Sequence, residues 1–317
     1  MPPVARRIDP SRTTLIQNAF ARELIGRFQW LAKQIIRHVE TEDSYGLGKG
    51  TNPKPVTHAA YQFLTDSKKL QAFSQWLEQQ MNAGVLGLVG QTDPDNPLTA
   101  SYITSAYRQG IVRAYIDAHP ELRADPTFYA KAQAVFLRDT FASPVAIEQV
   151  QSLATRAFEE MKGLSAYEKT QLNRILADGM VDGSGAAEVA RDMVDQIDGM
   201  TRTRALMIAR TEIVRAHAEG QLDAFQAMGM EELGMEAEWS TADDDAVCDD
   251  CQDAADESPY TIDEARGMIP LHPNCRCAWI PMPIQEQQER VAPKEEEQVS
   301  EEEQAAEEEL VAEGEGG

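Results

Sequence analysis

Residues 238–281 read EWSTADDDAVCDDCQDAADESPYTIDEARGMIPLHPNCRCAWIP, and this stretch holds all 4 cysteines of the chain. The cysteines form a C-x-x-C pair and, after a gap, a C-x-C pair, and a histidine stands three residues before the second pair. The side chains of this stretch that can bind a metal through sulfur or imidazole nitrogen are Cys248, Cys251, His272, Cys275 and Cys277. We therefore expect the stretch to fold as one module around this cluster.

The spacing of these side chains is typical of a structural zinc site. A C-x-x-C turn directs two thiolates to one tetrahedral metal, and a second pair completes the ligands. In an extended segment Cys275 and Cys277 point to the same face, because side chains repeat every two residues. His272 is a fifth candidate for four positions. Either one candidate is therefore not a ligand, or His272 positions the others.

Three alternatives to a structural zinc stay open from the sequence. The cysteines could be reduced and metal-free in a small β-rich turn. A disulfide is disfavoured because no secretion signal is visible and reducing compartments oppose disulfides. A catalytic zinc needs an open ligand position and usually has fewer thiolates, whereas candidate ligands here are in surplus.

The aspartates around the first cysteine pair do not match an EF-hand loop, and we expect them to be a solvated acidic loop.

Upstream of this module the hydrophobic pattern is helical. Apolar residues recur at three- or four-residue steps. A Ser-Pro pair and a Ser-x-x-Glu capping box mark two helix starts. The pattern predicts helices over residues 13–42, 57–83, 98–119, 125–141, 144–161, 165–179, 186–197 and 203–228. Strands are predicted at 236–240 and 277–281, with a short helix at 261–268 between them.

The predicted fold is therefore mainly α. We expect a helical N-terminal region over 1–142, a second domain over 143–283 that ends in a small α+β Cys/His module at 238–283, and a tail over 284–317. The tail is rich in Glu and Gln and low in apolar residues, so it cannot bury enough surface to offset the ordering entropy. We expect it to be disordered. A Gly/Pro/Asn stretch over residues 44–55 is predicted to be a linker.

The charge distribution narrows the choice of partners. The formal net charge is −24, and the tail contributes much of it through its glutamates. A body this acidic repels nucleic acid over most of its surface. Only the arginine-rich segment 1–39 could make a weak DNA contact, and an ordinary solvated helix face also explains it. No stretch is apolar enough to span a membrane and no signal peptide is visible, so we expect a protein made in the cytoplasm.

The order of motifs resembles the phage head-morphogenesis family, the minor head proteins similar to the F protein of phage Mu. The resemblance rests on the helical triplet Arg210-Thr211-Glu212, the strand residue Trp239, the C-x-x-C pair and the segment His272-Pro-Asn-Cys-Arg-Cys277. It covers about residues 164–283. From the triplet we expect a structural tie, in which Arg210 or Glu212 fixes the strand that contains Trp239.

The resemblance implies a non-enzymatic head protein inside the virion. It implies association with the portal protein, with the major capsid or scaffold protein as further partners, and a helical N-terminal half that binds them. We identify no catalytic residue and no cofactor other than zinc, and no membrane partner. An alternative is an enzyme domain similar to ADP-ribosyltransferases or toxins, with Arg210 and Glu212 as remnants of a nucleotide site. A zinc-ribbon-like nucleic-acid adaptor is a third reading that the charge disfavours.

Overall fold

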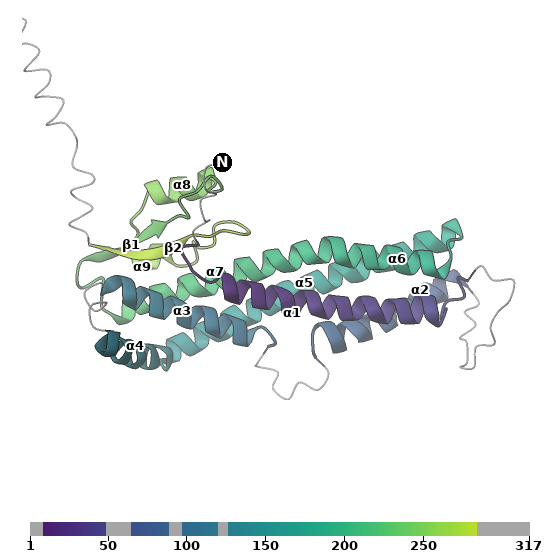
Figure 1. Cartoon of the computed structure of the whole chain (residues 1–317), viewed down its shortest axis with the longest axis horizontal. Helices are drawn as coiled ribbons and strands as arrows, with labels where there is room; N and C mark the ends of the chain where they lie inside the picture. Colours follow the sequence, from purple (N-terminus) through teal and green to yellow (C-terminus); the bar gives the residue numbers. More distant parts are fainter. Residues whose placement is uncertain (1–8, 49–64, 89–96, 120–125, 284–317) are drawn as a thin grey trace, which may run out of the picture.

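A computed structural model of the chain describes residues 9–48, 65–88, 97–119 and 126–283. It confirms the predicted fold class, because long helices are followed by a two-stranded sheet and a Cys/His cluster (Figure 1). The predicted tail, the basic positions 1–8 and parts of the predicted linker and helix around 49–64 lie outside the described residues. The helical elements are α1 (Thr14–Ile35), η1 (Ile36–Thr41), α2 (Asp66–Gln80), η2 (Met81–Val85), α3 (Ala100–Ala118), α4 (Pro126–Phe141), α5 (Pro144–Asp182), α6 (Ala186–Gln196), η4 (Ile197–Thr201) and α7 (Arg202–Ala227).

The long helix α5 corrects one prediction. Its start is as predicted, because the Ser143 hydroxyl accepts a hydrogen bond from the Ala146 amide at 3.2 Å and proline follows at the first helical position. The predicted capping box at Ser165 does not begin a new helix. The Ser165 hydroxyl instead donates to the Met161 carbonyl at 3.0 Å within one continuous helix of 39 residues. Glu168, the expected capping partner, is buried.

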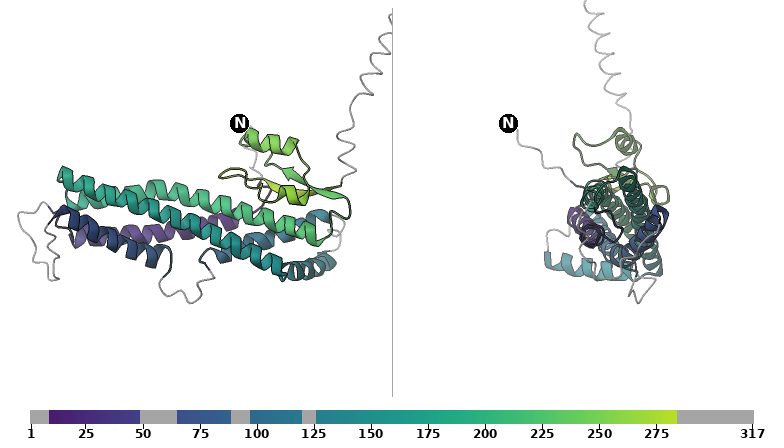
Figure 2. Two further views of the ribbon diagram at one scale, coloured as in Figure 1. Left: turned by 180° about the vertical axis from the view of Figure 1, so that it is seen from behind. Right: turned by 90° about the vertical axis from the view of Figure 1, so that its right-hand side faces the viewer.

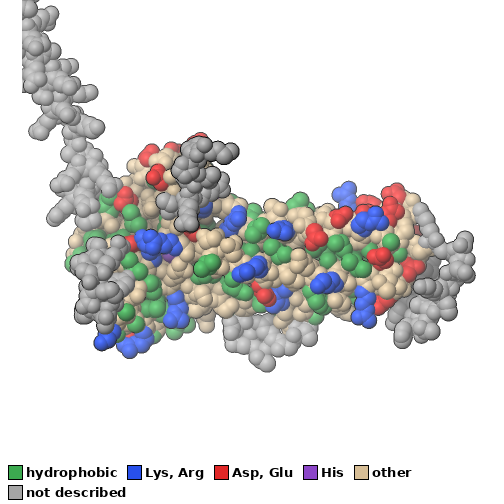
Figure 3. Space-filling view, in the orientation of Figure 1, with side chains coloured by type: hydrophobic (Ala, Val, Ile, Leu, Met, Phe, Trp, Pro, Cys, Tyr) green, Lys and Arg blue, Asp and Glu red, His purple; other side chains and the backbone are tan. Residues whose placement is uncertain are grey.

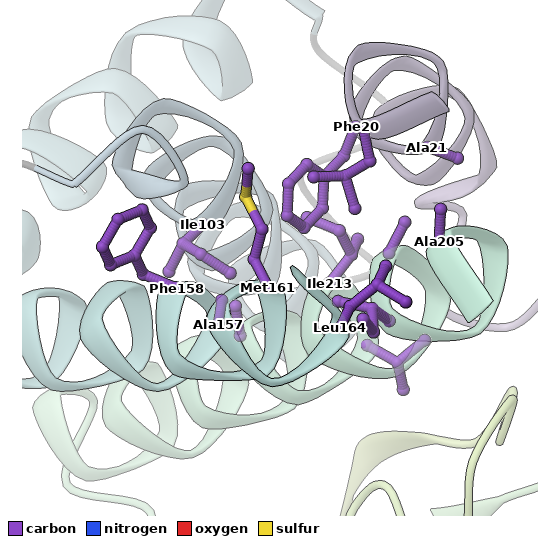
Figure 4. Packing of buried hydrophobic residues seen from close by; sticks show 14 of the residues in the cluster. Phe20, Ala21, Ile103, Ala157, Phe158, Met161, Leu164, Ala205 and Ile213 are labelled. Carbon is purple, nitrogen blue, oxygen red and sulfur yellow. The ribbon is translucent and has the colours of Figure 1, made fainter. Parts of the chain in front are cut away.

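The helices pack side by side into an elongated bundle (Figure 2). Apolar side chains from α1, α3, α5 and α7 share one core, in which Phe20, Ile103, Met161 and Ile213 come from four different helices (Figure 4). Helices on both sides of the predicted boundary at position 143 therefore belong to the same bundle. No helix of the described part is both long and apolar enough to cross a membrane.

Helices α3 and α7 approach each other closely through two glycines. A Cβ atom on Gly110 would overlap the His217 carbonyl, and one on Gly220 would overlap the Tyr107 carbonyl. Backbone atoms cannot move aside as a side-chain end can, so only glycine allows this separation. Helix α7 is consequently buried on nearly all sides from Ile213 to Phe225.

The small module lies on one flank of the bundle, against the C-terminal part of α7 (Figures 1 and 2). Its strands β1 (Met235–Ser240) and β2 (Ala278–Pro283) pair antiparallel, with Trp239 opposite Trp279. Between them lie α8 (Asp249–Asp256) and α9 (Ile262–Ala265). Both predicted strands and the predicted short helix are confirmed within a few residues, and Thr261 with Glu264 closes a capping box on α9.

A two-stranded sheet is marginal by itself in water, so this module needs further links. One is aromatic, because Trp239 and Trp279 meet edge to face at a centroid distance of 5.2 Å and Tyr260 packs against Trp279. Tyr260 also forms a backbone bridge to Ala237 beside β1. The remaining links are polar, and they define the candidate site.

Candidate metal centre and its anchor on helix α7

The predicted ligand side chains are brought together from two separate segments. Cys248 lies immediately before α8 and Cys251 in its first turn, whereas His272 comes from the loop between α9 and β2. The Nε2 atom of His272 lies 3.2 Å from the Cys248 sulfur and 3.1 Å from the Cys251 sulfur. The Cys251 sulfur lies 3.9 Å from the sulfur of Cys275. The cluster therefore links the start of α8 to the loop that leads into β2.

The orientation of His272 is fixed by its second ring nitrogen. Nδ1 lies 2.9 Å from the Pro273 carbonyl, which can only accept, so Nδ1 carries the proton. Nε2 is then the free nitrogen, and it faces the two sulfurs. Metal-binding histidines commonly have this arrangement, in which one nitrogen donates to a carbonyl and the other binds the ion.

The candidate ligand atoms form two overlapping groups. The first contains Cys248, Cys251 and His272, and the second contains Cys251, Cys275 and Cys277, with the ligand atoms in each group all within 4.8 Å of one another. In a zinc tetrahedron with thiolate and imidazole ligands the ligand atoms are about 3.5 to 3.8 Å apart, from Zn–S near 2.3 Å and Zn–N near 2.0 Å. Thiolate and imidazole are the ligands that tetrahedral zinc prefers, and Cys251 is common to both groups. The cysteines are all free, so none of them is in a disulfide.

Burial and mutual contact give the thiols different pKa values. Burial, together with the neighbouring Cys275 charge, raises the pKa of Cys251 to about 12. A hydrogen bond from the Cys277 thiol lowers the pKa of Cys275 to about 5, and the same hydrogen bond with burial raises the pKa of Cys277. One thiolate is thus readily formed in the absence of metal, whereas several adjacent thiolates need a cation to balance them.

The acidic loop beside the first cysteine pair is largely solvated, as predicted. Its exposed members are Asp243, Asp245, Asp249 and Asp250. Asp244 is the exception, because both its oxygens accept from the Arg276 guanidinium, at 2.6 and 2.5 Å. This bidentate pair joins the acidic loop to the residue between the second pair of cysteines.

Helix α7 anchors the module through residues other than those predicted. The expected tie ran from Arg210 or Glu212 to β1. Arg210 is instead exposed, and Glu212 pairs with Arg156 at 3.3 Å and Arg215 at 3.7 Å. Of the triplet, it is Thr211 that contacts the module, since its hydroxyl accepts a hydrogen bond from the Asn274 amide at 3.2 Å. Trp239 is buried and packs edge to face against Trp279.

Gln221 forms the most buried anchor. Its side-chain nitrogen donates to the Trp279 carbonyl at 2.6 Å, and its side-chain oxygen accepts from the Trp279 amide at 3.1 Å. The amide side chain thus pairs with β2 as a neighbouring strand would, and both backbone groups are satisfied without water. These two hydrogen bonds fix the distance between the sheet and α7.

A second anchor is a charged network around Arg266, the residue that follows α9. Arg266 pairs with Asp223 at 2.7 Å and with Glu219 at 3.4 Å. Glu219 also accepts from the Gly267 amide at 2.9 Å, and Asp223 accepts from the Tyr107 hydroxyl. The network connects the module to α7 and α3 at once. Buried charges are tolerated only when they are fully paired and hydrogen-bonded. We therefore expect the network to fix the orientation of the module on α7 and α3 and to add little to the free energy of unfolding.

Gln221, Glu219 and Asp223 were not predicted as site residues. Their signal in the sequence is indirect: polar residues occur on every face of the segment 213–225, although alanine and glycine there allow close packing. A helix that is buried all round needs partners for each polar side chain, and those partners lie far away along the chain.

A hollow of about 240 Å³ lies between α5, α7 and the His272 loop. Glu212 forms part of its wall and is 3% exposed, and burial raises its pKa against the lowering effect of Arg215 and Arg156. On the loop side the wall is formed by the segment 270–273, which is apolar except for His272. Glu212 therefore contributes to the junction between the bundle and the module, but it pairs within the bundle.

Comparison with known proteins supports the predicted resemblance. Residues 170–280 match the family described as Phage Mu protein F like protein. The resemblance to the phage head-morphogenesis family, predicted for about residues 164–283, is confirmed over this region. The matched region runs from the second half of α5 through α7 to β2, so it contains the cysteine cluster and its anchors. No curated protein and no solved structure gives a significant match to the chain.

Proposed function

We propose that the chain is a minor head protein of a tailed phage and acts in head morphogenesis. The observation that carries this proposal is the family match, because it falls on the part of the fold with the most specific architecture, α7 and the clamped module. We propose further that the protein lies inside the head in the virion, after assembly in the host cytoplasm. The portal protein is the partner we favour, followed by the major capsid or scaffold protein.

We assign docking to the helical bundle. It is elongated, and it makes up most of the described surface on the face shown (Figure 3). On the face shown, basic side chains are scattered along the bundle, and acidic side chains gather at its right-hand end and on the small module (Figure 3). Contact with packaged DNA would accordingly be weak and sensitive to salt.

We propose that the Cys/His cluster binds one structural zinc. The residues available to hold it are Cys248, Cys251, His272, Cys275 and Cys277. When bound, zinc would neutralise the thiolates and join α8 to the loop before β2, and its binding energy would become folding energy of the module. Elemental analysis of purified protein should give about one zinc per chain, lost in Cys248→Ser or Cys275→Ser. A metal-free protein of unchanged stability would contradict this proposal.

We propose that the role is structural rather than catalytic. Glu212 pairs within the bundle, and Arg210 is exposed. Incubation with NAD should therefore produce neither transfer nor hydrolysis. Turnover that disappears in Glu212→Ala would establish an enzyme instead.

The assembly role is tested on purified heads. Quantitative mass spectrometry of heads from a producing host should detect the chain in the particle, and affinity capture of the tagged chain should recover the portal ring. A chain that stays free in the lysate and is absent from the heads would contradict the proposal. Capture of major capsid or scaffold protein without portal would reassign the partner.

A further inference from the structure

Helix α1, which lies along the side of the bundle that faces the viewer in Figure 1, carries an exposed tryptophan. The chain has 4 tryptophans, all within the described residues, and Trp30 is the one that is exposed, at 37%. Its ring lies over η2, because a Cβ atom on Gly84 would overlap the ring. The ring is therefore held against the neighbouring helix while part of it faces solvent. Aromatic side chains held in this way are common anchors of protein–protein interfaces.

A hollow of about 340 Å³ lies beside this ring, and its lining consists of Arg22, Glu23, Gly26, Arg27, Trp30 and Gly84. Gly26 is exposed, and a Cβ atom on it would meet no atom within 4 Å. Glycine in a helix interior is destabilising relative to alanine, and no described neighbour excludes a larger side chain at this position. The glycine leaves space that a partner approaching α1 closely would need.

The charges around the hollow leave one arginine without a carboxylate. Arg27 pairs with Glu23 at 2.7 Å and donates to the Gly84 carbonyl at 3.2 Å. Arg22 is exposed, and its Nε donates to the Asn18 carbonyl at 3.2 Å. Within the described ranges no carboxylate pairs with Arg22. The lining therefore carries one uncompensated positive charge next to an aromatic wall.

A carboxylate side chain fits this combination. Its negative charge would pair with the guanidinium of Arg22, while its methylene groups and its apolar neighbours would pack against Trp30. Lys33 is exposed and lies three positions beyond Trp30, so it presents a second positive charge on the same face of the helix. Nucleic acid fits less well, because the chain as a whole has a formal net charge of −24.

We propose that the hollow on α1 is a docking site for an acidic segment of another protein of the phage head. The segment inserts a Glu or Asp side chain between Arg22 and Trp30 and approaches α1 closely at Gly26. Arg22 supplies the charge, Trp30 the apolar contact and Gly26 the space. This inference deepens the docking role proposed for the bundle and rests on that proposed function.

The test measures binding of the purified full chain to the portal ring, the major capsid protein and the scaffold protein of the same phage, each purified, by biolayer interferometry. The variants are Arg22→Glu and Gly26→Leu. Arg191→Glu is the control for charge, since it reverses an exposed arginine of α6. Gly163→Leu is the control for size, since Gly163 in α5 is also exposed and its Cβ would also meet no atom within 4 Å.

We expect each variant to lower the affinity for one of the three proteins by about 10-fold or more, while both controls bind like the wild type. Gly26→Leu should melt no lower than the wild type, so its loss of binding would not come from unfolding. Equal binding by the wild type and both variants would overturn the docking site and leave the proposed head function standing.

A wild-type chain that binds none of the three proteins would also overturn the docking site, and detection of the chain in purified heads separately decides the proposed function. Two further measurements test other occupants of the hollow. If Arg22→Glu abolishes binding to a short DNA duplex, or self-association in sedimentation, and leaves binding to the three proteins unchanged, the acidic segment is overturned in favour of DNA or of a second copy.

Discussion

The bundle and the module are stabilised in different ways. Helices α1, α3, α5 and α7 bury a continuous set of large apolar side chains, and burial of each is worth roughly 1.5 to 3 kcal/mol. The module has two short strands and two short helices, so it buries few side chains of this kind. It is held by the tryptophan pair, the anchors on α7 and the Cys/His cluster. The bundle therefore depends on packing, whereas the module depends on a small number of specific links.

The largest effect is expected from the packing of the bundle. Gly220→Ala places a methyl group against the backbone of α3 and should destabilise the protein by about 3 kcal/mol, because the two helices must separate. The matched control is Gly163→Ala in α5, where the added Cβ meets no atom within 4 Å. The control should gain about 1 kcal/mol from helix propensity. Urea unfolding followed by far-UV circular dichroism measures the free energy of unfolding of both variants. The same change in both would contradict the close approach of α3 and α7.

A loss of stability of similar size is expected when the pH is lowered, because of His217 in the bundle. Burial lowers the pKa of His217 to about 4, against the raising effect of Asp9. A hydrogen bond with Gln221 also raises the pKa of His217, but burial has the larger effect. Because the unfolded chain takes up this proton near pH 6.5, the contribution of neutral His217 is complete above that pH. It falls as pH drops from 6.5 to about 4, by about 1.4 kcal/mol per unit.

The check is a series of urea unfolding curves between pH 7 and 4 for the wild type and His217→Gln. The variant should show a shallower loss of stability over this range, because it has no imidazole to protonate. Parallel curves for the two proteins would indicate that His217 is accessible to solvent or already paired.

A smaller effect, confined to the module, is expected from Gln221. Gln221→Ala leaves the buried amide and carbonyl of Trp279 without partners, which should cost about 2 kcal/mol. Near-UV circular dichroism of the tryptophan pair should report the loss before the bundle unfolds. Gln252→Ala is the control, because its hydrogen bond to Asp256 is exposed and its removal should change stability by less than about 0.5 kcal/mol. An unchanged stability and an unchanged near-UV spectrum in Gln221→Ala would show that the sheet does not depend on α7.

The same contrast explains what the sequence could predict. Periodic apolar residues identified the helices, and alternation around Trp239 identified β1, because those signals are local. The Cys/His cluster was predictable because its spacing along the sequence is typical of metal ligands. The capping box at Ser165 was misleading, since a motif for a helix start is equally compatible with a helix interior when the residues before it already pack.

The anchors on α7 could not be predicted in the same way. Gln221 and Asp223 satisfy groups on Trp279 and Arg266, which are more than forty positions away along the chain. Nothing local distinguishes them from ordinary polar residues of a helix. The triplet at 210–212 was noticed through a family resemblance, yet it is Thr211 whose hydroxyl accepts a hydrogen bond from the module. Long-range polar contacts depend on the finished fold, so a local pattern does not contain them.

We propose that a metal link holds the module while the bundle folds without it. Hydrogen exchange measured by mass spectrometry, on the purified chain with and without a strong zinc chelator, separates the two regions. The amides of β1, β2 and α8 should exchange much faster after chelation, while those of α3 and α7 keep their protection. Unchanged protection in β1 and β2, or equal loss of protection in the bundle, would show that no metal link holds the module separately.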